Sequence, residues 1–205
     1  MSTPNKHWPA LSELSPDDSL HISPEAISRI SGNAPLSIKE AAVLWYRLLG
    51  FRGEKGFGYA VRRRLEVKEV AVEPSPDDPE KLSAKMVCEL EVVPDMCNAE
   101  GVLSHGCMAG LMDEGSAIAL LLMRLTEGGD HVIGVSQTLN VFFHHPAPGV
   151  GSRIRIVNRS VSTQDEVGCC QSEIWDIQNH RLIVTGSQLQ MMPSTPAPSA
   201  GKNQD

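Results

Sequence analysis

The residues of this chain that could perform chemistry are two adjacent carboxylates inside a very apolar stretch. Asp113 and Glu114 lie near the middle of segment 103–123, which otherwise consists mostly of apolar and small residues. Charges at the centre of a lipid bilayer are costly, so the two acids argue against a membrane span and predict a helix buried in a folded domain. At about 100° per residue, Asp113 shares one face of that helix with three small residues, Gly106, Gly110 and Ala117.

The small neighbours of Asp113 bear on its role. They let a ligand or a second backbone approach the carboxylate closely, as a functional site requires. The plainer alternative is an acid that faces water or pairs with a basic residue, because charged residues usually lie at the surface. Glu114 is the competing candidate for the functional acid, since it projects about 100° away from Asp113. The stripe that we expect to pack on a sheet consists of Met108, Leu111, Met112, Gly115, Ala119 and Leu122.

The start of this helix could bind a developing negative charge. Ser104 precedes the periodic region and is predicted to be the N-cap, with its hydroxyl accepting a hydrogen bond from the amide of Cys107. The amides of His105 and Gly106 would then project from the positive end of the helix. Such amides can stabilise a carbonyl oxygen as charge grows on it.

The elements that must position these residues follow a pattern typical of an α+β domain. A short helix is predicted within 23–31 and a longer one from Ser37 to Gly50, with Ser37 and Glu40 as a capping box and Gly50 as the stop. Apolar alternation and turn residues predict six strands, within 64–73, 81–93, 132–147, 152–162, 167–177 and 181–192. We therefore expect an antiparallel sheet that wraps around the one very apolar helix.

Composition excludes several classes of function. The 205 residues suit one domain with an extension, and the net charge of -7 argues against attraction to nucleic acid or to an anionic membrane. Five cysteines without metal-ligand spacing predict reduced thiols, no metal site and an intracellular location. The first thirty residues lack the features of a signal or transit peptide, which favours the cytoplasm, with a mitochondrial location as the alternative.

Four motifs in the second half of the chain resemble those of a known family. They are NAEGVLSHG (98–106), LMD (111–113), GVSQTLNV (134–141) and HPAPG (145–149). Hotdog-fold acyl-CoA thioesterases of the phenylacetate-degradation and small human type have a similar series: N-x-x-G-x-L-H-G-G, a long helix with L-x-D, G-V-S-x-x-x-N-[VI] and a P-A turn. The resemblance covers about 81–192 and needs no gap between Asn98 and Asp113.

The resemblance implies a curved antiparallel sheet around a central helix, assembly into dimers or dimers of dimers, no cofactor, and an acyl-CoA thioester as the small-molecule substrate. It also implies sites in which the carboxylate of one subunit faces the asparagine and the helix start of another. By position, Asp113 would be the general base or the nucleophile, and the amide of His105 would polarise the thioester carbonyl. Asn98 and Ser136 would position the water or the acyl group, and Ser104 would stand where the family has its histidine.

The helix start departs from the family motif, because L-H-G-G is replaced by LSHG at residues 103–106. Either the imidazole has moved by one residue, or a one-residue deletion preserves the role of His105 and transfers that of the acid to Glu114. A third alternative is an inactive hotdog protein that binds acyl-CoA or another ligand. A hotdog dehydratase is less favoured because its acid and histidine motif is not found. A metal site at His144 and His145 is also discounted, because no further ligands are spaced to complete it.

Three arginines of the fourth predicted strand are candidates for substrate binding. Arg153, Arg155 and Arg159 share one face of the strand, while Ile154 and Ile156 alternate to the other. Arginines on an exposed strand face are usually solvated. Planar guanidinium groups also bind phosphate well, so in a CoA-binding protein these residues would hold the nucleotide phosphates.

Composition divides the chain into three expected segments. Residues 1–56 would form an N-terminal extension with a helix, residues 57–192 the hotdog domain, and residues 193–205 a disordered tail rich in Pro, Ser and Ala. Within the extension, residues 1–35 are rich in Ser, Pro and charge, and we expect a loosely attached arm there.

Overall fold

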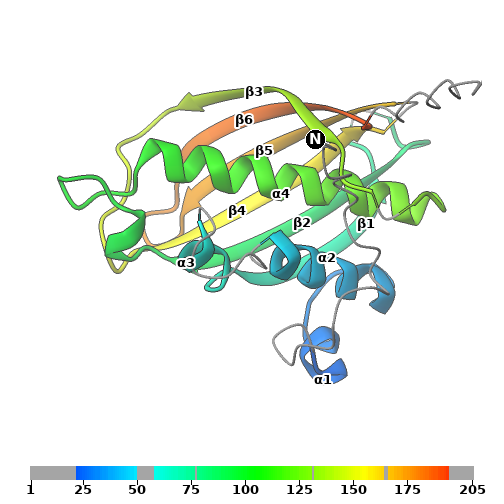
Figure 1. The fold of residues 1–205 in the computed structure, drawn as a ribbon, viewed down its shortest axis with the longest axis horizontal. Coiled ribbons are helices and arrows are strands. Elements are labelled where there is room, and N and C mark those ends of the chain that lie inside the picture. Colours follow the sequence, from blue (N-terminus) through cyan, green and yellow to red (C-terminus); the bar gives the residue numbers. More distant parts are fainter. Residues whose placement is uncertain (1–21, 50–57, 77, 131, 164–165, 194–205) are drawn as a thin grey trace, which may run out of the picture.

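The protein folds as a six-stranded antiparallel sheet with one long helix lying across it (Figure 1). This computed structural model describes residues 22–49, 58–76, 78–130, 132–163 and 166–193. The strands are β1 (Glu66–Pro74), β2 (Leu82–Glu91), β3 (Val135–Phe143), β4 (Arg153–Ser162), β5 (Val167–Asp176) and β6 (Arg181–Met191). The helices are α1 (Pro24–Ser28), α2 (Leu36–Leu49), α3 (Tyr59–Arg62), the 3-10 helix η4 (Pro94–Met96) and the long helix α4 (His105–Thr126).

The strand order, β1-β2-β4-β5-β6-β3, places β3 at one edge of the sheet and β1 at the other. Figure 1 shows α4 crossing the sheet, with α2 beside it over the β1 and β2 side. The predicted α+β fold, with six strands and a central helix, is confirmed.

Helix α4 is held by an apolar stripe that packs on the sheet. Every residue of the predicted stripe is buried: Met108, Leu111, Met112, Gly115, Ala119 and Leu122. Ile118 and Leu121, on the flank that α2 covers, are also fully buried. By length and composition α4 could cross a membrane, but 67% of its most apolar window is buried within the fold. The predicted buried core helix is therefore confirmed.

Residues 22–35 pack on the fold. Ile30 is buried in the main core, and the chain beside it pairs with β1. The amide of Ser31 donates to the carbonyl of Lys68 at 2.9 Å, and the carbonyl of Ser31 accepts from the amide of Val70 at 3.0 Å. The prediction of a loosely attached arm is wrong for this part, because pairing with a distant strand supplies an order that local composition does not indicate.

Helix α2 begins one residue earlier than predicted. It starts at Leu36, and the amide of Lys39 donates to the carbonyl of Pro35 at 3.1 Å. Ser37 therefore lies inside the first turn and not at the N-cap, so the predicted capping box with Glu40 is wrong. The carbonyl of the preceding proline already accepts the first helical hydrogen bond.

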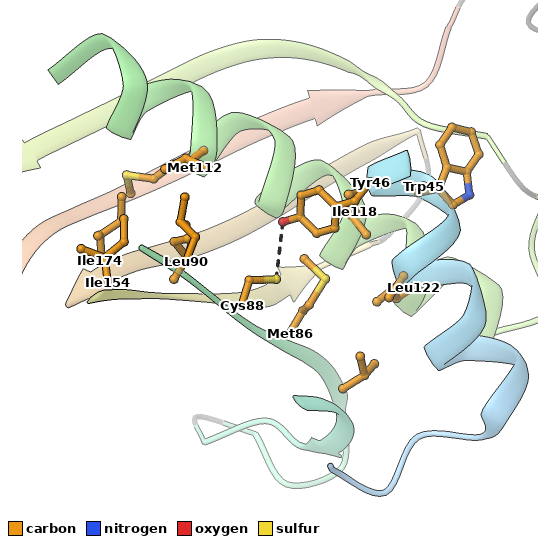
Figure 2. Close-up of a cluster of buried hydrophobic side chains, with 14 of the residues drawn as sticks. Trp45, Tyr46, Met86, Cys88, Leu90, Met112, Ile118, Leu122, Ile154 and Ile174 are labelled. Carbon is orange, nitrogen blue, oxygen red and sulfur yellow. Dashed lines mark hydrogen bonds between the residues drawn. The ribbon is translucent and has the colours of Figure 1, made fainter. Parts of the chain in front are cut away.

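The inner face of α2 joins the main core (Figure 2). The thiol of Cys88 donates to the hydroxyl of Tyr46 at 3.7 Å, and both side chains are buried. Burial raises the pKa of Cys88 to about 12, so this thiol stays protonated at neutral pH. All five cysteines are free, as predicted.

Three predictions fall outside the described residues. They concern residues 1–21 of the expected arm, the helix stop at Gly50, and residues 194–205 of the expected tail. The segment boundaries at residues 56 and 192 also stay predictions.

Candidate active site

The carboxylate of Asp113 lies where α4 meets β3 and β6, and two side chains donate hydrogen bonds to it. The hydroxyl of Ser136, on β3, donates to Oδ1 of Asp113 at 2.8 Å. The Nε2 amide of Gln188, on β6, donates to the same oxygen. This amide also lies 3.0 Å from Oγ of Ser136 and 3.2 Å from the backbone oxygen of Asp113. The structure thus brings together two of the predicted site residues, with a glutamine that the sequence analysis did not single out.

An open groove runs beside this carboxylate. Its cavity of about 360 Å³ is lined by Ala109, Gly110 and Asp113 of α4 and by residues 136–139 of β3. Small-ligand sites are typically clefts of roughly 300–1,000 Å³. The groove can therefore hold a slender ligand group next to the carboxylate.

Gly110 keeps this groove open. A Cβ built on Gly110 would meet no atom within 4 Å, whereas a Cβ on Gly115 would lie 2.6 Å from Nδ2 of the buried Asn158. Gly115 is therefore required by packing, and Gly110 borders free space. Ala117, the last small residue on this face of α4, is buried and does not line the groove.

Glu114 is directed toward the N-terminal helices. Nε of Arg62, in α3, donates to both carboxylate oxygens at 2.8 Å, and Nη2 makes a further ion-pair contact. Burial raises the pKa of Tyr46 well above its usual value, and the nearby Cys88 and the charge of Glu114 raise it further. The charge of Glu114 is paired with Arg62, and Glu114 does not line the groove. Glu114 therefore has a structural role, which favours Asp113 as the functional acid.

The start of α4 presents free backbone amides. Ser104 is the N-cap, as predicted, and its hydroxyl accepts from the amide of Cys107 at 3.1 Å. Within the described chain the amides of His105 and Gly106 have no acceptor, as expected for the first turn of a helix. Both residues are exposed, so their amides are available to a ligand.

Asn98 is held rigidly in a turn before the helix. Its Oδ1 accepts hydrogen bonds from the amides of Glu100 at 3.0 Å and Val102 at 3.3 Å. The side chain is exposed, and its NH₂ group donates to no other described residue. The turn thus orients a free donor toward solvent.

The helix start and the carboxylate of Asp113 do not meet within one chain. Eight residues separate His105 from Asp113 on α4, which is about 12 Å along the axis. A general base must lie within about 3 Å of the proton that it removes, or reach it through one water. A carbonyl held at the helix start is therefore out of reach of the carboxylate of the same chain.

Cys107 does not compete as a nucleophile at the helix start. Burial raises its pKa to about 11, with smaller contributions from Cys97 and Glu114. Since the thiolate is the reactive form, a protonated thiol is inert at neutral pH.

Comparisons with known proteins agree with this geometry. Residues 100–183 match the sequence model of the thioesterase superfamily. The crystal structure of zebrafish thioesterase superfamily member 2 has a TM-score of 0.56 at 22% identity, covering 72% of this chain and 93% of that one. Residues 100–183 are thus similar to a thioesterase superfamily domain, and the chain has the hotdog fold of the solved thioesterases.

Two bacterial structures show the same fold. A hypothetical thioesterase from Streptococcus pneumoniae with coenzyme A has a TM-score of 0.51 at 13% identity, covering 66% of this chain and 90% of that one. The E. coli PaaI protein of the phenylacetic acid degradation operon has a TM-score of 0.50 at 12% identity, covering 73% and 94%. No curated protein sequence matches the chain. The predicted resemblance to hotdog thioesterases is confirmed at the level of domain and fold.

The thioesterase superfamily match includes only part of the candidate site. Asp113 and Ser136 lie inside the matched residues 100–183, whereas Asn98 and Gln188 lie just beyond its two ends. Gln188 projects inward from β6 and is almost fully buried, as is Gln190 two residues later. The signal that could have indicated Gln188 is this alternation of two glutamines at inward positions of a strand, where apolar residues are expected.

The three candidate arginines of the thioesterase superfamily domain project from β4 away from the buried Ile154 and Ile156, and each has an acidic partner. Arg155 lies 2.8 Å from Glu89 on β2, and Arg153 lies 3.5 Å from the same carboxylate. Arg159 pairs with a glutamate of β1 at 3.8 Å. A role in CoA binding stays a prediction. In the single chain the guanidinium groups of Arg153 and Arg155 link β4 to the neighbouring β2, and that of Arg159 reaches across β2 to β1.

The two histidines after β3 are occupied by local contacts in this thioesterase superfamily domain. Nε2 of His144 lies 2.7 Å from Oγ1 of Thr185, and Nδ1 of His145 lies 2.7 Å from the carbonyl oxygen of Leu182. Among the described residues, no group of three or more His, Cys, Asp or Glu side chains is placed to hold a metal ion.

Proposed function

We propose that the protein hydrolyses an acyl-CoA thioester to free CoA and a carboxylic acid. The observation that carries the proposal is the carboxylate of Asp113 at the wall of the groove, with Oδ1 held by Ser136 and Gln188. Membership in the thioesterase superfamily supports this class of substrate, and the S. pneumoniae relative was solved with coenzyme A.

In the proposed reaction Asp113 acts as the general base or as the nucleophile. As a base, it takes a proton from a water whose oxygen forms a bond to the thioester carbon. The carbonyl oxygen becomes negatively charged and is stabilised by the amide of His105 and the NH₂ group of Asn98. Collapse of the intermediate breaks the C–S bond, and the CoA thiolate takes the proton from Asp113. As a nucleophile, Asp113 attacks the thioester carbon, breaks the C–S bond and expels the CoA thiolate, and water then hydrolyses the resulting acyl anhydride to the carboxylic acid and the free carboxylate of Asp113.

The proposed site requires two copies of the chain, joined along β3. In the described structure β3 pairs only with β6, so its second edge has free backbone donors and acceptors. Most of its side chains are exposed, including Val135 and Phe142. An exposed edge of this kind is a template for pairing, and a two-fold axis would use the same edge twice. In the proposed dimer, the helix start of one subunit lies near the carboxylate of the other.

Complementation between two inactive variants tests this shared site. Asn98→Asp keeps the Oδ1 acceptor of the turn and removes the free donor, and Asp113→Asn removes the acid. If each site takes Asn98 from one subunit and Asp113 from the other, each mixed dimer contains one intact site. Co-expression should then restore roughly a quarter of the wild-type CoA release, since half of the randomly formed dimers are mixed. Activity no higher than that of the parent variants would contradict a shared site.

The proposed phosphate contacts lead to a separate kinetic prediction. The double variant Arg153→Ala with Arg155→Ala should raise KM for acyl-CoA more than it lowers kcat, because phosphate binding is distant from the reacting carbonyl. Glu89→Gln is the matched control, since it removes the carboxylate that the two arginines share and keeps their charge. An unchanged KM in the double variant, or an equal rise in Glu89→Gln, would remove the proposal.

The direct test of function is release of free CoA from a panel of short, long and aromatic acyl-CoAs. Turnover that depends on Asp113 supports hydrolysis. The alternative is an inactive protein that binds acyl-CoA, which the LSHG sequence at the helix start favours. If calorimetry shows binding of acyl-CoA but no member of the panel is turned over, the proposed hydrolysis is rejected in favour of the binding protein.

A further inference from the structure

The side chain of Gln188 is buried, and its NH₂ group donates hydrogen bonds to the candidate catalytic acid and to Ser136 beside it. The residue is 1% exposed. Its Nε2 donates to Oδ1 of Asp113, to the backbone oxygen of Asp113 and to Oγ of Ser136. These contacts connect β6 to α4 and β3 through Asp113 and Ser136, which both line the groove.

The other half of this amide has no partner. Oε1 of Gln188 is buried and accepts no hydrogen bond from the described residues. Leaving a buried polar atom unpaired is costly, and the neighbouring Gln190 has a similar unpaired atom at Nε2. Rotating the amide by 180° would place Oε1 against the carboxylate oxygen of Asp113, which is repulsive. The orientation of the amide is therefore set by the acid.

The hydrogen bonds divide the two oxygens of Asp113 into different roles. Oδ1 accepts from both Ser136 and Gln188, whereas Oδ2 accepts from no side chain in the described ranges. A carboxylate held at one oxygen keeps a fixed rotamer and presents the other oxygen for chemistry.

We propose that Gln188 is a positioning residue for the proposed hydrolysis. Together with Ser136 it anchors Oδ1 of Asp113, so that Oδ2 is the reactive oxygen. The inference rests on the proposed function, because it assigns the reactive oxygen of the proposed acid.

Few charged groups surround this acid among the described residues. On α4 the neighbouring Glu114 is already paired with Arg62 of α3. The residues of β3 and β6 that contact Asp113 are Ser136 and Gln188, and both are uncharged. A fall in kcat on replacing Gln188 by an apolar residue would therefore report the lost hydrogen bond and not a changed ion pair.

The test compares Gln188→Met with Gln190→Met. Methionine has nearly the same shape as glutamine and donates no hydrogen bond. Gln190 is the matched control because it is equally buried on the same strand but contacts Arg124 and not the acid. Gln188→Met should lower kcat about 10- to 100-fold with a small change in KM, the range expected for a hydrogen bond to a charged group. Gln190→Met should leave kcat at the wild-type value.

The split between kcat and KM supplies a readout that a merely structural role would not move. Losing the anchor of Oδ1 misdirects the acid without changing how acyl-CoA binds, so kcat should fall at nearly unchanged KM in Gln188→Met, while both constants should stay at the wild-type values in Gln190→Met. If Gln188→Met does not fold, Gln188→Leu serves the same comparison. Equal kcat in the wild type and the Gln188 variant would overturn the inference.

A crystal structure of Gln188→Met separates this inference from the proposed function. An Asp113 carboxylate in a changed rotamer, in a protein without thioesterase turnover, would support the anchoring by Gln188 and reject hydrolysis. A carboxylate in the wild-type rotamer, in a protein that hydrolyses acyl-CoA, would reject the anchoring and retain hydrolysis.

Discussion

Replacing Asp113 by Asn should lower kcat for CoA release by about 100-fold or more. Asparagine has nearly the same shape, so its side chain can still occupy the space between α4, β3 and β6. It cannot accept a proton from water or attack the thioester, and general base catalysis alone contributes about 10²–10⁴. The measurement is the initial rate of thiol release at saturating acyl-CoA.

Glu114→Gln is the matched control for this experiment, because it makes the same chemical change at the next residue. It removes one charge of the pair with Arg62 and should lower thermal stability while retaining most of kcat. If Glu114→Gln abolished turnover and Asp113→Asn did not, the assignment of the acid would be reversed and the shifted alignment of the helix start would hold.

Filling the groove at Gly110 should have the second largest effect. Gly110→Leu places a branched side chain in the free space beside Asp113 and should lower kcat/KM for long-chain acyl-CoA by about tenfold or more, because even one methylene that does not fit costs about 1–3 kcal/mol. Gly110→Ala, with one methyl group, should have a smaller effect in the same direction. The measurement is kcat/KM across a series of acyl-chain lengths.

Stability measurements distinguish this effect from damage to the fold. Since a Cβ at Gly110 meets no atom within 4 Å, Gly110→Ala should raise the free energy of unfolding by about 1 kcal/mol, the usual gain from alanine inside a helix. Gly115→Ala should instead lower it by about 1–3 kcal/mol, because its Cβ would press on Asn158. A Gly110→Leu variant with an unchanged chain-length profile would show that the groove does not hold the acyl group.

The long helix and the strands of this protein could be predicted from its amino-acid sequence. The apolar spacing of α4 is a local property, so the pattern of residues 105–126 predicted its buried stripe and the small-residue face that carries Asp113. The N-cap at Ser104 depends on contacts within one turn and was predicted for the same reason. Alternation of side chains along each strand likewise indicated the six strands of the sheet.

The different contacts of Asp113 and Glu114 depend on the tertiary structure and could not be predicted from the sequence. Asp113 meets Gln188, 75 residues away along the chain, while Glu114 meets Arg62 at a distance of 52 residues. Neighbouring acids on a helix have nearly the same local signature, and their roles depend on which distant side chains the packing places against each face. The packing of residues 22–35 against β1 was likewise hidden, because such pairings depend on the whole fold and leave no periodicity in the local sequence.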